Sequence, residues 1–263
     1  MTPRAFFTAS VMVTAGMMGG RILGLLREML IASQFGAGPD ASFAIILLML
    51  PDFFTGALLG GTAISAVLLP AFAERNDEDI LALCWQSALL CAGFFATIAL
   101  LLALQAETLV SFFAEGTTFH YASSDLRLVL CSLPVAALTW VLVAYLQHRQ
   151  SFAAFSVGTL GFNAVIVSVL WLAGGSMLML SIAIVLGIMA RLIIHLISFA
   201  KHGGRWVNPL ANWQLQKPLL LAYGSTLSSN ILSFLPQYIP YAVIAASGSS
   251  LRRTCTVTTL VPA

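Results

Sequence analysis

The sequence has 263 residues, of which 59% are hydrophobic and only 8% are charged, and its formal net charge is +2. Soluble domains carry about 25% charged residues, so this composition excludes an ordinary soluble domain and predicts an all-α, polytopic membrane protein. The small net charge and the absence of a long basic run also argue against nucleic-acid binding.

Apolar stretches long enough to cross a bilayer recur along the chain. A transmembrane helix needs about 20 residues, and the stretches of that length are approximately 5–34, 40–73, 79–113, 126–148, 152–173, 177–200 and 218–246. We therefore predict a bundle of about seven transmembrane helices. The first three stretches exceed one crossing, which predicts tilt, kinks or extension beyond the membrane. The first is also too long for a signal-peptide core, so we expect it to remain in the protein.

Two arginines, Arg21 and Arg27, interrupt the first apolar stretch. A guanidinium in hydrocarbon is unfavourable unless it faces a wet cavity or a partner, and its fork matches phosphate and carboxylate oxygens. Glu28 follows Arg21 by seven residues and shares its helix face. This region is therefore a candidate site for an anionic substrate.

Two acidic residues follow in the second stretch. Asp40 comes directly after a Gly- and Pro-rich turn and is placed to cap the next helix. Asp52 follows Pro51, where the missing backbone hydrogen bond predicts a kink and a pocket. The arginines either pair with Glu28, Asp40 or Asp52 only to hold the bundle together, or the group lines a hydrated cavity. Because burying several charges without a role is unfavourable, we favour the cavity.

Glycines recur every four residues in the first stretch, at Gly16, Gly20 and Gly24, and Gly56 and Gly60 repeat the spacing. Small residues at this interval let helix backbones approach closely. We therefore expect tight helix packing at these positions, with a hinge as the alternative interpretation.

Asn163 and Arg191 are polar residues in later spans. Asn163 is expected to bond a neighbouring helix or a ligand, and Arg191 to line the cavity or to reach toward the headgroups. The sequence has no serine–histidine, metal-ligand or phosphate-loop pattern, and its four cysteines lack metal spacing. We therefore predict no enzymatic activity, no metal and no cofactor.

The basic residues outside the spans predict the orientation. With a cytoplasmic N-terminus, the opposite side receives Arg127 alone, if the last residues are set aside. The cytoplasmic side then receives Arg4, Arg75, Arg149, Lys201, Arg205 and Lys217. This asymmetry favours a cytoplasmic N-terminus. The segment around Trp206 and Trp213 is more polar than its neighbours and suits the level of the lipid headgroups.

Several motifs follow one another in the first third of the chain: GRILGLLRE over residues 20–28, FGAG over 35–38, Asp40-Ala41, LPD over 50–52 and LPAF over 69–72. In order and spacing they resemble the opening of the MviN/MurJ family. Those proteins are the lipid II flippases of bacterial peptidoglycan synthesis, within the larger group of multidrug and polysaccharide-lipid exporters. The resemblance covers roughly residues 5–250.

The resemblance implies a transporter of fourteen spans in two lobes, located in the bacterial inner membrane. Its central cationic cavity binds an undecaprenyl-pyrophosphate-linked saccharide, and arginines of the first lobe engage the pyrophosphate. Arg21, Arg27 and Asp40 fall on matching motif positions. Membrane lipids and cell-wall synthesis proteins are the further partners that it implies.

The resemblance also predicts how the chain is divided. We expect a six-helix lobe over residues 1–202, a cytoplasmic interfacial linker over 203–217, a seventh transmembrane helix over 218–250 and an atypical tail over 251–263. Because the chain has about half the family length and its tail departs from the family pattern, we expect an incomplete product, truncated or frameshifted.

One departure from the family pattern keeps other functions open. The family usually carries an arginine and then Glu-Gly-Ala after its Leu-Pro-Asp motif, where this chain has Thr55-Gly56 and Gly60-Gly61-Thr62. One cavity cation is therefore missing, so an exopolysaccharide or O-antigen precursor is an alternative substrate. A non-transporting scaffold for envelope synthesis is a second alternative. An intramembrane enzyme acting on lipid pyrophosphates lacks a nucleophile or metal cluster.

Overall fold

The computed structural model describes residues 3–36, 38–58, 61–113, 122–210, 212–214, 217–226 and 228. Its helices are α1 (Pro3–Phe35), α2 (Pro39–Leu58), α3 (Gly61–Ala73), α4 (Asp77–Leu104), α5 (Ala106–Phe113), α6 (Ala122–Leu130), α7 (Leu133–His148), α8 (Ala153–Ala173) and α9 (Met177–Lys201). Residues 217–226 are also helical. No strand occurs in these ranges, which confirms the all-α prediction.

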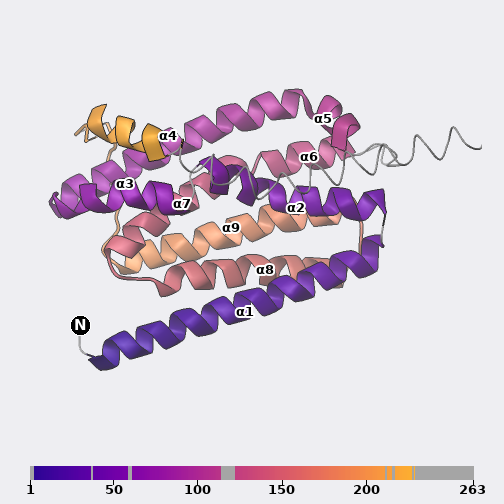
Figure 1. The fold of residues 1–263 in the computed structure, drawn as a ribbon, viewed down its shortest axis with the longest axis horizontal. Helices are drawn as coiled ribbons and strands as arrows, with labels where there is room; N and C mark the ends of the chain where they lie inside the picture. The colour runs from indigo at the N-terminus through magenta and orange to yellow at the C-terminus, as the bar shows by residue number, and fades with distance from the viewer. Residues whose placement is uncertain are drawn as a thin grey trace, which may run out of the picture.

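Within the described residues, five segments are long and apolar enough to cross a membrane: Pro39–Gly56, Asp77–Leu104, Ala122–His148, Ala153–Ala173 and Met177–Lys201. Figure 1 shows most of them as long helices running roughly side by side. This arrangement is that of a polytopic helical membrane protein. The charged α1 is not among the five, although its 33 residues make it longer than each of them. Most of the predicted seventh span, 218–246, lies outside the described residues.

The longest predicted stretches are divided into shorter helices. The stretch 40–73 forms α2 and α3, the stretch 79–113 forms α4 and α5, and α6 and α7 share the next one. Pro51 lies inside α2 rather than at its end. Its carbonyl accepts a hydrogen bond from the buried Thr55 hydroxyl at 2.7 Å. The predicted stretch 40–73, which exceeds one crossing, thus holds two helices, one that ends at Leu58 and one that begins at Gly61.

The start of α2 corrects the expectation for Asp40. The helix begins at Pro39, so Asp40 lies in its first turn and is not the cap. The Gly38 carbonyl accepts the hydrogen bond from the Ser42 backbone N–H at 3.1 Å instead. A carboxylate in the first turn still favours the helix, because the helix dipole is positive at that end.

Helix α8 packs between α1 and α9, and Figure 1 shows α1 running along α8 at one edge of the bundle. The α1 glycines face α8. A Cβ atom added at Gly16 would lie 2.7 Å from Ser156 Cβ, whereas one added at Gly20 would lie 3.6 Å from its nearest neighbour, Thr159. The predicted close approach is confirmed for α1. The partner position Gly60 lies outside the described residues.

Residues 203–214 connect α9 to the helix at 217–226 and lie against the start of α4. Gln86 donates to the carbonyls of Pro209 at 2.7 Å and Asn212 at 2.6 Å, and accepts from the Gln214 backbone N–H at 2.8 Å. Asp79 Oδ1 accepts from the side chains of Asn212 and Gln214, each at 2.7 Å. These polar side chains of α4 fix a segment whose described residues, 203–210 and 212–214, form no helix or strand.

Aromatic packing strengthens the same attachment. Trp85 donates its indole N–H to the Arg205 carbonyl at 3.0 Å, and its ring lies 4.6 Å from that of Trp206, centre to centre. The Arg205 guanidinium pairs with Glu78 at 3.1 Å. Residues 203–214 are therefore docked on α4 through both polar and apolar contacts.

Candidate functional site

Two consecutive residues of α8, Phe162 and Asn163, each hold an arginine from a different helix. Arg27 of α1 donates from Nη1 to Asn163 Oδ1 at 2.8 Å. The Cζ atom of Arg191, from α9, lies 4.5 Å from the centre of the Phe162 ring, within the range of a cation–π contact. Both α8 side chains are buried. Two adjacent positions of α8 thus orient the guanidiniums of Arg27 and Arg191.

Asn163 is itself fixed by a second bond. Its Nδ2 donates to the Gly20 carbonyl at 3.0 Å, which leaves Oδ1 as the acceptor for Arg27. The amide therefore bridges the backbone of α1 and the arginine one and a half to two turns further along the same helix. Asn163 bonds a neighbouring helix, as one of the two sequence interpretations predicted.

Each of these arginines also pairs with a carboxylate. Arg27 Nη2 lies 2.7 Å from Glu28 Oε1, with side-chain exposures of 17% and 46%. Arg191 Nη1 lies 3.1 Å from Asp52 Oδ1, with exposures of 11% and 52%. The guanidiniums are mostly covered, whereas their acidic partners are about half exposed. The site thus combines fixed cations with more accessible anions.

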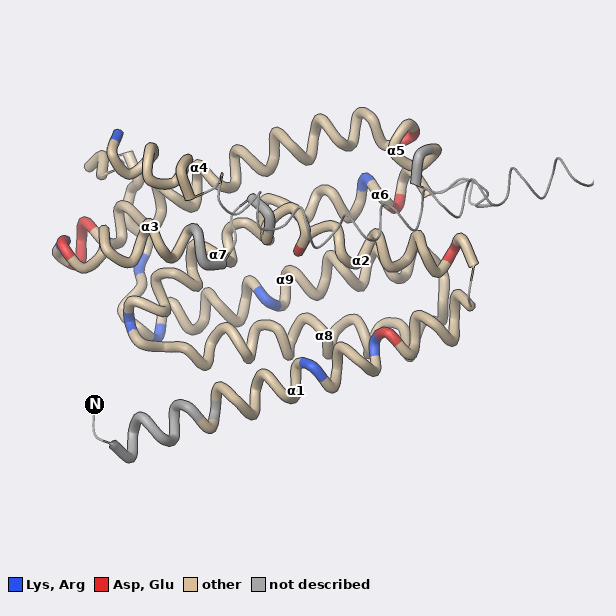
Figure 2. Tube along the Cα trace, viewed as in Figure 1, with Lys and Arg blue, Asp and Glu red and all other residues tan. Residues whose placement is uncertain are grey.

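The structure does not bring every predicted residue into this group. Arg21 is exposed, and it forms neither an ion pair nor a hydrogen bond with any other described residue. Asp40 likewise has no such partner in the described ranges, and it lies in the first turn of α2. Figure 2 shows basic positions along the middle of α1 and α9, away from the helix ends. Arg21 is therefore a cation on the surface of α1 that no other described residue compensates.

The sequence did not reveal two features of the site. Phe162 resembles any other apolar residue of a span, and only the fold places Arg191 over its ring. The Arg191–Asp52 pair joins residues 139 positions apart. The nearby His195 is buried and donates from Nδ1 to the Arg191 carbonyl at 2.8 Å. Its position four residues after Arg191, on one helix face, was the only local signal for that contact.

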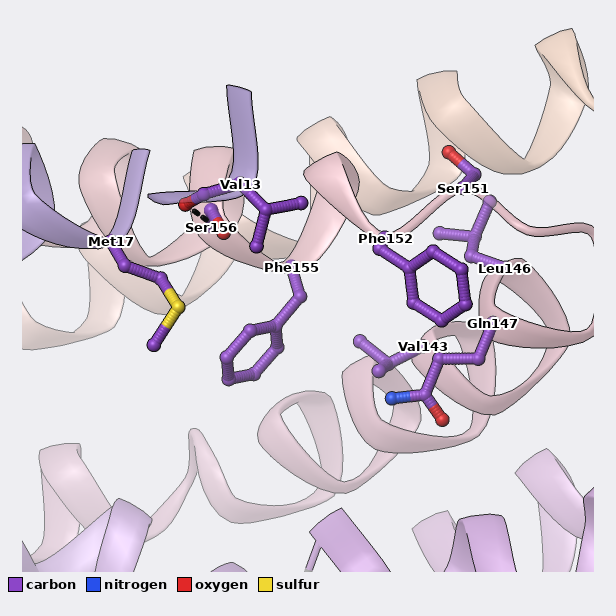
Figure 3. Close-up of a pocket in the computed structure, with 9 residues that line it drawn as sticks. All are labelled: Val13, Met17, Val143, Leu146, Gln147, Ser151, Phe152, Phe155 and Ser156. Carbon is purple, nitrogen blue, oxygen red and sulfur yellow. Dashed lines mark hydrogen bonds between the residues drawn. The ribbon is translucent and has the colours of Figure 1, made fainter. Parts of the chain in front are cut away.

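A cavity of about 150 Å³ lies apart from the arginines, between α1, the end of α7 and the start of α8. Figure 3 shows two phenylalanine rings, Phe152 and Phe155, beside it, with Ser156 donating to the Val13 carbonyl at 3.4 Å. The lining contains no charged residue: Val13, Met17, Val143, Leu146, Gln147, Ser151, Phe152, Phe155 and Ser156. Its chemistry suits an apolar occupant and not an anion.

Among the described residues, no group of three or more His, Cys, Asp or Glu side chains is placed to hold a metal ion. The charged groups held beside α8 are two arginine–carboxylate pairs, Arg27–Glu28 on the side of α1 and Arg191–Asp52 on the side of α9. Guanidiniums form strong, often bidentate hydrogen bonds to phosphate and carboxylate oxygens. What this arrangement can do chemically is to bind and orient an anionic group.

Comparison with known proteins places this chain in a family. The family described as lipid II flippase MurJ matches residues 31–255. A curated relative, the probable lipid II flippase MurJ of Aquifex aeolicus (strain VF5), is 25% identical over 167 residues. That alignment covers 60% of this chain and 33% of the relative, so the chain spans only part of the relative's length. No solved structure matches. With a match over most of its length, this chain belongs to the MurJ lipid II flippase family.

Proposed function

We propose that this chain forms the substrate-binding first lobe of a flippase that moves an undecaprenyl-pyrophosphate-linked saccharide, lipid II or a related precursor, across the bacterial inner membrane. Family membership supports the class of protein. The observation that carries the proposal is Arg27, a cation inside α1 and about two turns before its end, that Asn163 holds in a fixed orientation. An arginine within a membrane helix is retained where it serves a polar pathway or ligand.

Arg21 and Arg27 are assigned to the pyrophosphate. Arg27 is preoriented by Asn163, and Arg21 is exposed without a partner in the described part of the chain. A pyrophosphate offers several anionic oxygens, which the planar guanidinium fork binds at two points. A bound pyrophosphate would supply the negative charge that Arg21 does not receive from any described residue.

Three carboxylates complete the proposed site. Glu28 and Asp52 pair with Arg27 and Arg191, and so keep the region close to neutral without a ligand. Asp40 is included because it falls on a motif position shared with the family, at the start of α2. Asn163 and Arg191 contribute from the neighbouring helices, the first by orienting Arg27.

One residue of α2 bears on which saccharide the lipid carries. Thr55 stands where the family usually carries an arginine, and its hydroxyl is buried against the Pro51 carbonyl. It therefore adds no cation to the site. This observation favours an exopolysaccharide or O-antigen precursor as the second candidate substrate.

Transport by alternating access needs two lobes that move about a central site. The alignment with the Aquifex relative covers a third of that protein, so we assign binding to this chain and assign transport to its assembly with a second lobe. We also propose that the N-terminus is cytoplasmic, as the distribution of basic residues favours.

Binding tests the proposal directly. The chain is reconstituted in phosphatidylcholine nanodiscs and titrated with undecaprenyl pyrophosphate, with undecaprenol as the uncharged comparison. We expect Arg27→Met to weaken pyrophosphate binding roughly tenfold or more, the effect of losing one hydrogen bond to a charged group. Arg149→Met is the matched control, because Arg149 pairs with Asp77 away from the site. Equal binding of both lipids by the unaltered chain would refute the proposal.

A further inference from the structure

We propose that Arg191 is a further phosphate-binding cation of this site, and that Asp52 occupies it until a phosphate group of the lipid takes its place. This inference rests on the proposed function. It concerns how the pyrophosphate is held, and it adds α9 to the helices that bind it.

The neighbours of Arg191 hold its guanidinium in place. Its side chain is 11% exposed and its guanidinium lies over the Phe162 ring. The ring in turn packs closely against α9, because a Cβ atom added at Gly187 would lie 2.8 Å from Phe162 Cδ2. The guanidinium is therefore held from one side by α8 and reaches its acidic partner on the other.

Asp52 is the partner that a phosphate group would displace from Arg191. Its side chain is 52% exposed, and the bond to Arg191 at 3.1 Å is its only hydrogen bond among the described residues. Asp52 is therefore the more accessible partner of a pair whose arginine is mostly covered. A phosphate carries more negative charge than one carboxylate and offers more acceptor oxygens, so it competes well for the same guanidinium.

Arg191 also has unused donors. Its Nε–H is buried and has no hydrogen-bond partner in the described part of the chain. A guanidinium has five N–H donors, and Asp52 engages one nitrogen, Nη1. The same construction recurs at Arg27, which has a rigid partner on α8, a half-exposed Glu28 and a buried Nε–H without a partner. The repetition at two arginines favours a ligand-binding role over a single tie between α2 and α9.

The alternative is that the Arg191–Asp52 pair only connects α2 to α9. The two roles predict opposite effects for Asp52→Asn. If the carboxylate competes with the ligand, its removal tightens binding. If the pair only supports the fold, its removal lowers thermal stability and leaves binding unchanged or weaker.

The experiment uses the whole chain in phosphatidylcholine nanodiscs, with undecaprenyl pyrophosphate and undecaprenol as probes. We expect Asp52→Asn to tighten pyrophosphate binding roughly two- to fivefold, the range for releasing an exposed ion pair. Arg191→Met should weaken it roughly tenfold, and Arg191→Lys should restore part of the loss because the charge remains without the fork. Binding of undecaprenol should not change in any variant.

Asp77→Asn is the matched control, since it removes the same charge from another arginine pair, Arg149–Asp77, whose exposures are 27% and 72%. It should leave binding unchanged. If the unaltered chain binds the pyrophosphate and Arg27→Met loses it, while Asp52→Asn and Arg191→Met do not alter binding, the inference on Arg191 is overturned and the proposed function stands. If the unaltered chain does not distinguish the two lipids, both fail. Should Arg191→Met not fold, the Asp52→Asn result decides alone.

Discussion

The Asn163 side chain donates a hydrogen bond to the Gly20 carbonyl at 3.0 Å, and so ties α8 to the backbone of α1. The same amide receives Arg27 on its other end. Helix packing and the orientation of a charged side chain therefore depend on one residue.

Replacing Asn163 with leucine should reduce both stability and ligand binding. The substitution leaves the Gly20 carbonyl and Arg27 without this partner, at a cost of roughly 1–3 kcal/mol in the free energy of unfolding. Thermal unfolding in nanodiscs measures the effect. Ser168→Ala is the control on the same helix, because the exposed Ser168 bonds only its own helix, at the Ala164 carbonyl. An Asn163→Leu protein as stable as this control would contradict the assigned bridge.

Alanine substitutions at two α1 glycines should have opposite effects. At Gly16 the new Cβ would meet Ser156 Cβ at 2.7 Å, so α1 and α8 must separate, and we expect a loss of roughly 1–3 kcal/mol. At Gly20 the nearest atom lies at 3.6 Å, an ordinary contact, so the better helix propensity of alanine should leave stability unchanged or raised by up to about 1 kcal/mol. Comparing the two melting temperatures checks the pair, and equal losses would show that the crossing is not as close as described.

Gln86→Ala should release the segment over residues 203–214. The substitution removes the bonds to the Pro209 and Asn212 carbonyls and to the Gln214 N–H. We expect faster trypsin cleavage after Arg205, measured by mass spectrometry of the digested nanodisc sample. Glu74→Gln serves as the control, because Glu74 is exposed and has no hydrogen bond or ion pair within the described ranges. Unchanged cleavage in Gln86→Ala would mean that the contacts of Glu78, Asp79 and Trp85 are enough to hold the segment.

The proposed orientation can be tested with two cysteines at opposite ends of α4. Glu78 and Glu107 flank the helix and are each 80% exposed. In a background with Cys131→Ser and Cys255→Ser, an impermeant maleimide should label Glu107→Cys in intact spheroplasts and Glu78→Cys only in inverted vesicles. The remaining Cys84 is buried and Cys91 is partly buried. The reverse labelling pattern would place the N-terminus outside.

Local sequence features predicted the helical fold and the close approach of α1. A period of four in Gly16, Gly20 and Gly24 fixes a smooth helix face whatever the partner is. The division of the longest stretches was less accessible, because apolar composition alone does not show where one helix ends. Pro51 was expected to kink its helix, and α2 continues through it to Leu58.

The candidate site was only half visible in the sequence. Arg21, Arg27 and Glu28 lie close together along the chain, so their grouping could be predicted. The Arg191–Asp52 pair and the contact with Phe162 join distant segments, and one sequence carries no signal for such pairs. The attachment of residues 209–214 to Gln86 escaped prediction for the same reason, since glutamine in a span resembles a solitary polar residue.

The docking of residues 203–214 has a mechanical consequence. A slack connection would absorb movement of whatever follows it, but this one is held by Asp79, Trp85 and Gln86 from a single helix. The place at which the chain reaches residue 214 is therefore set by α4 and not by the end of α9.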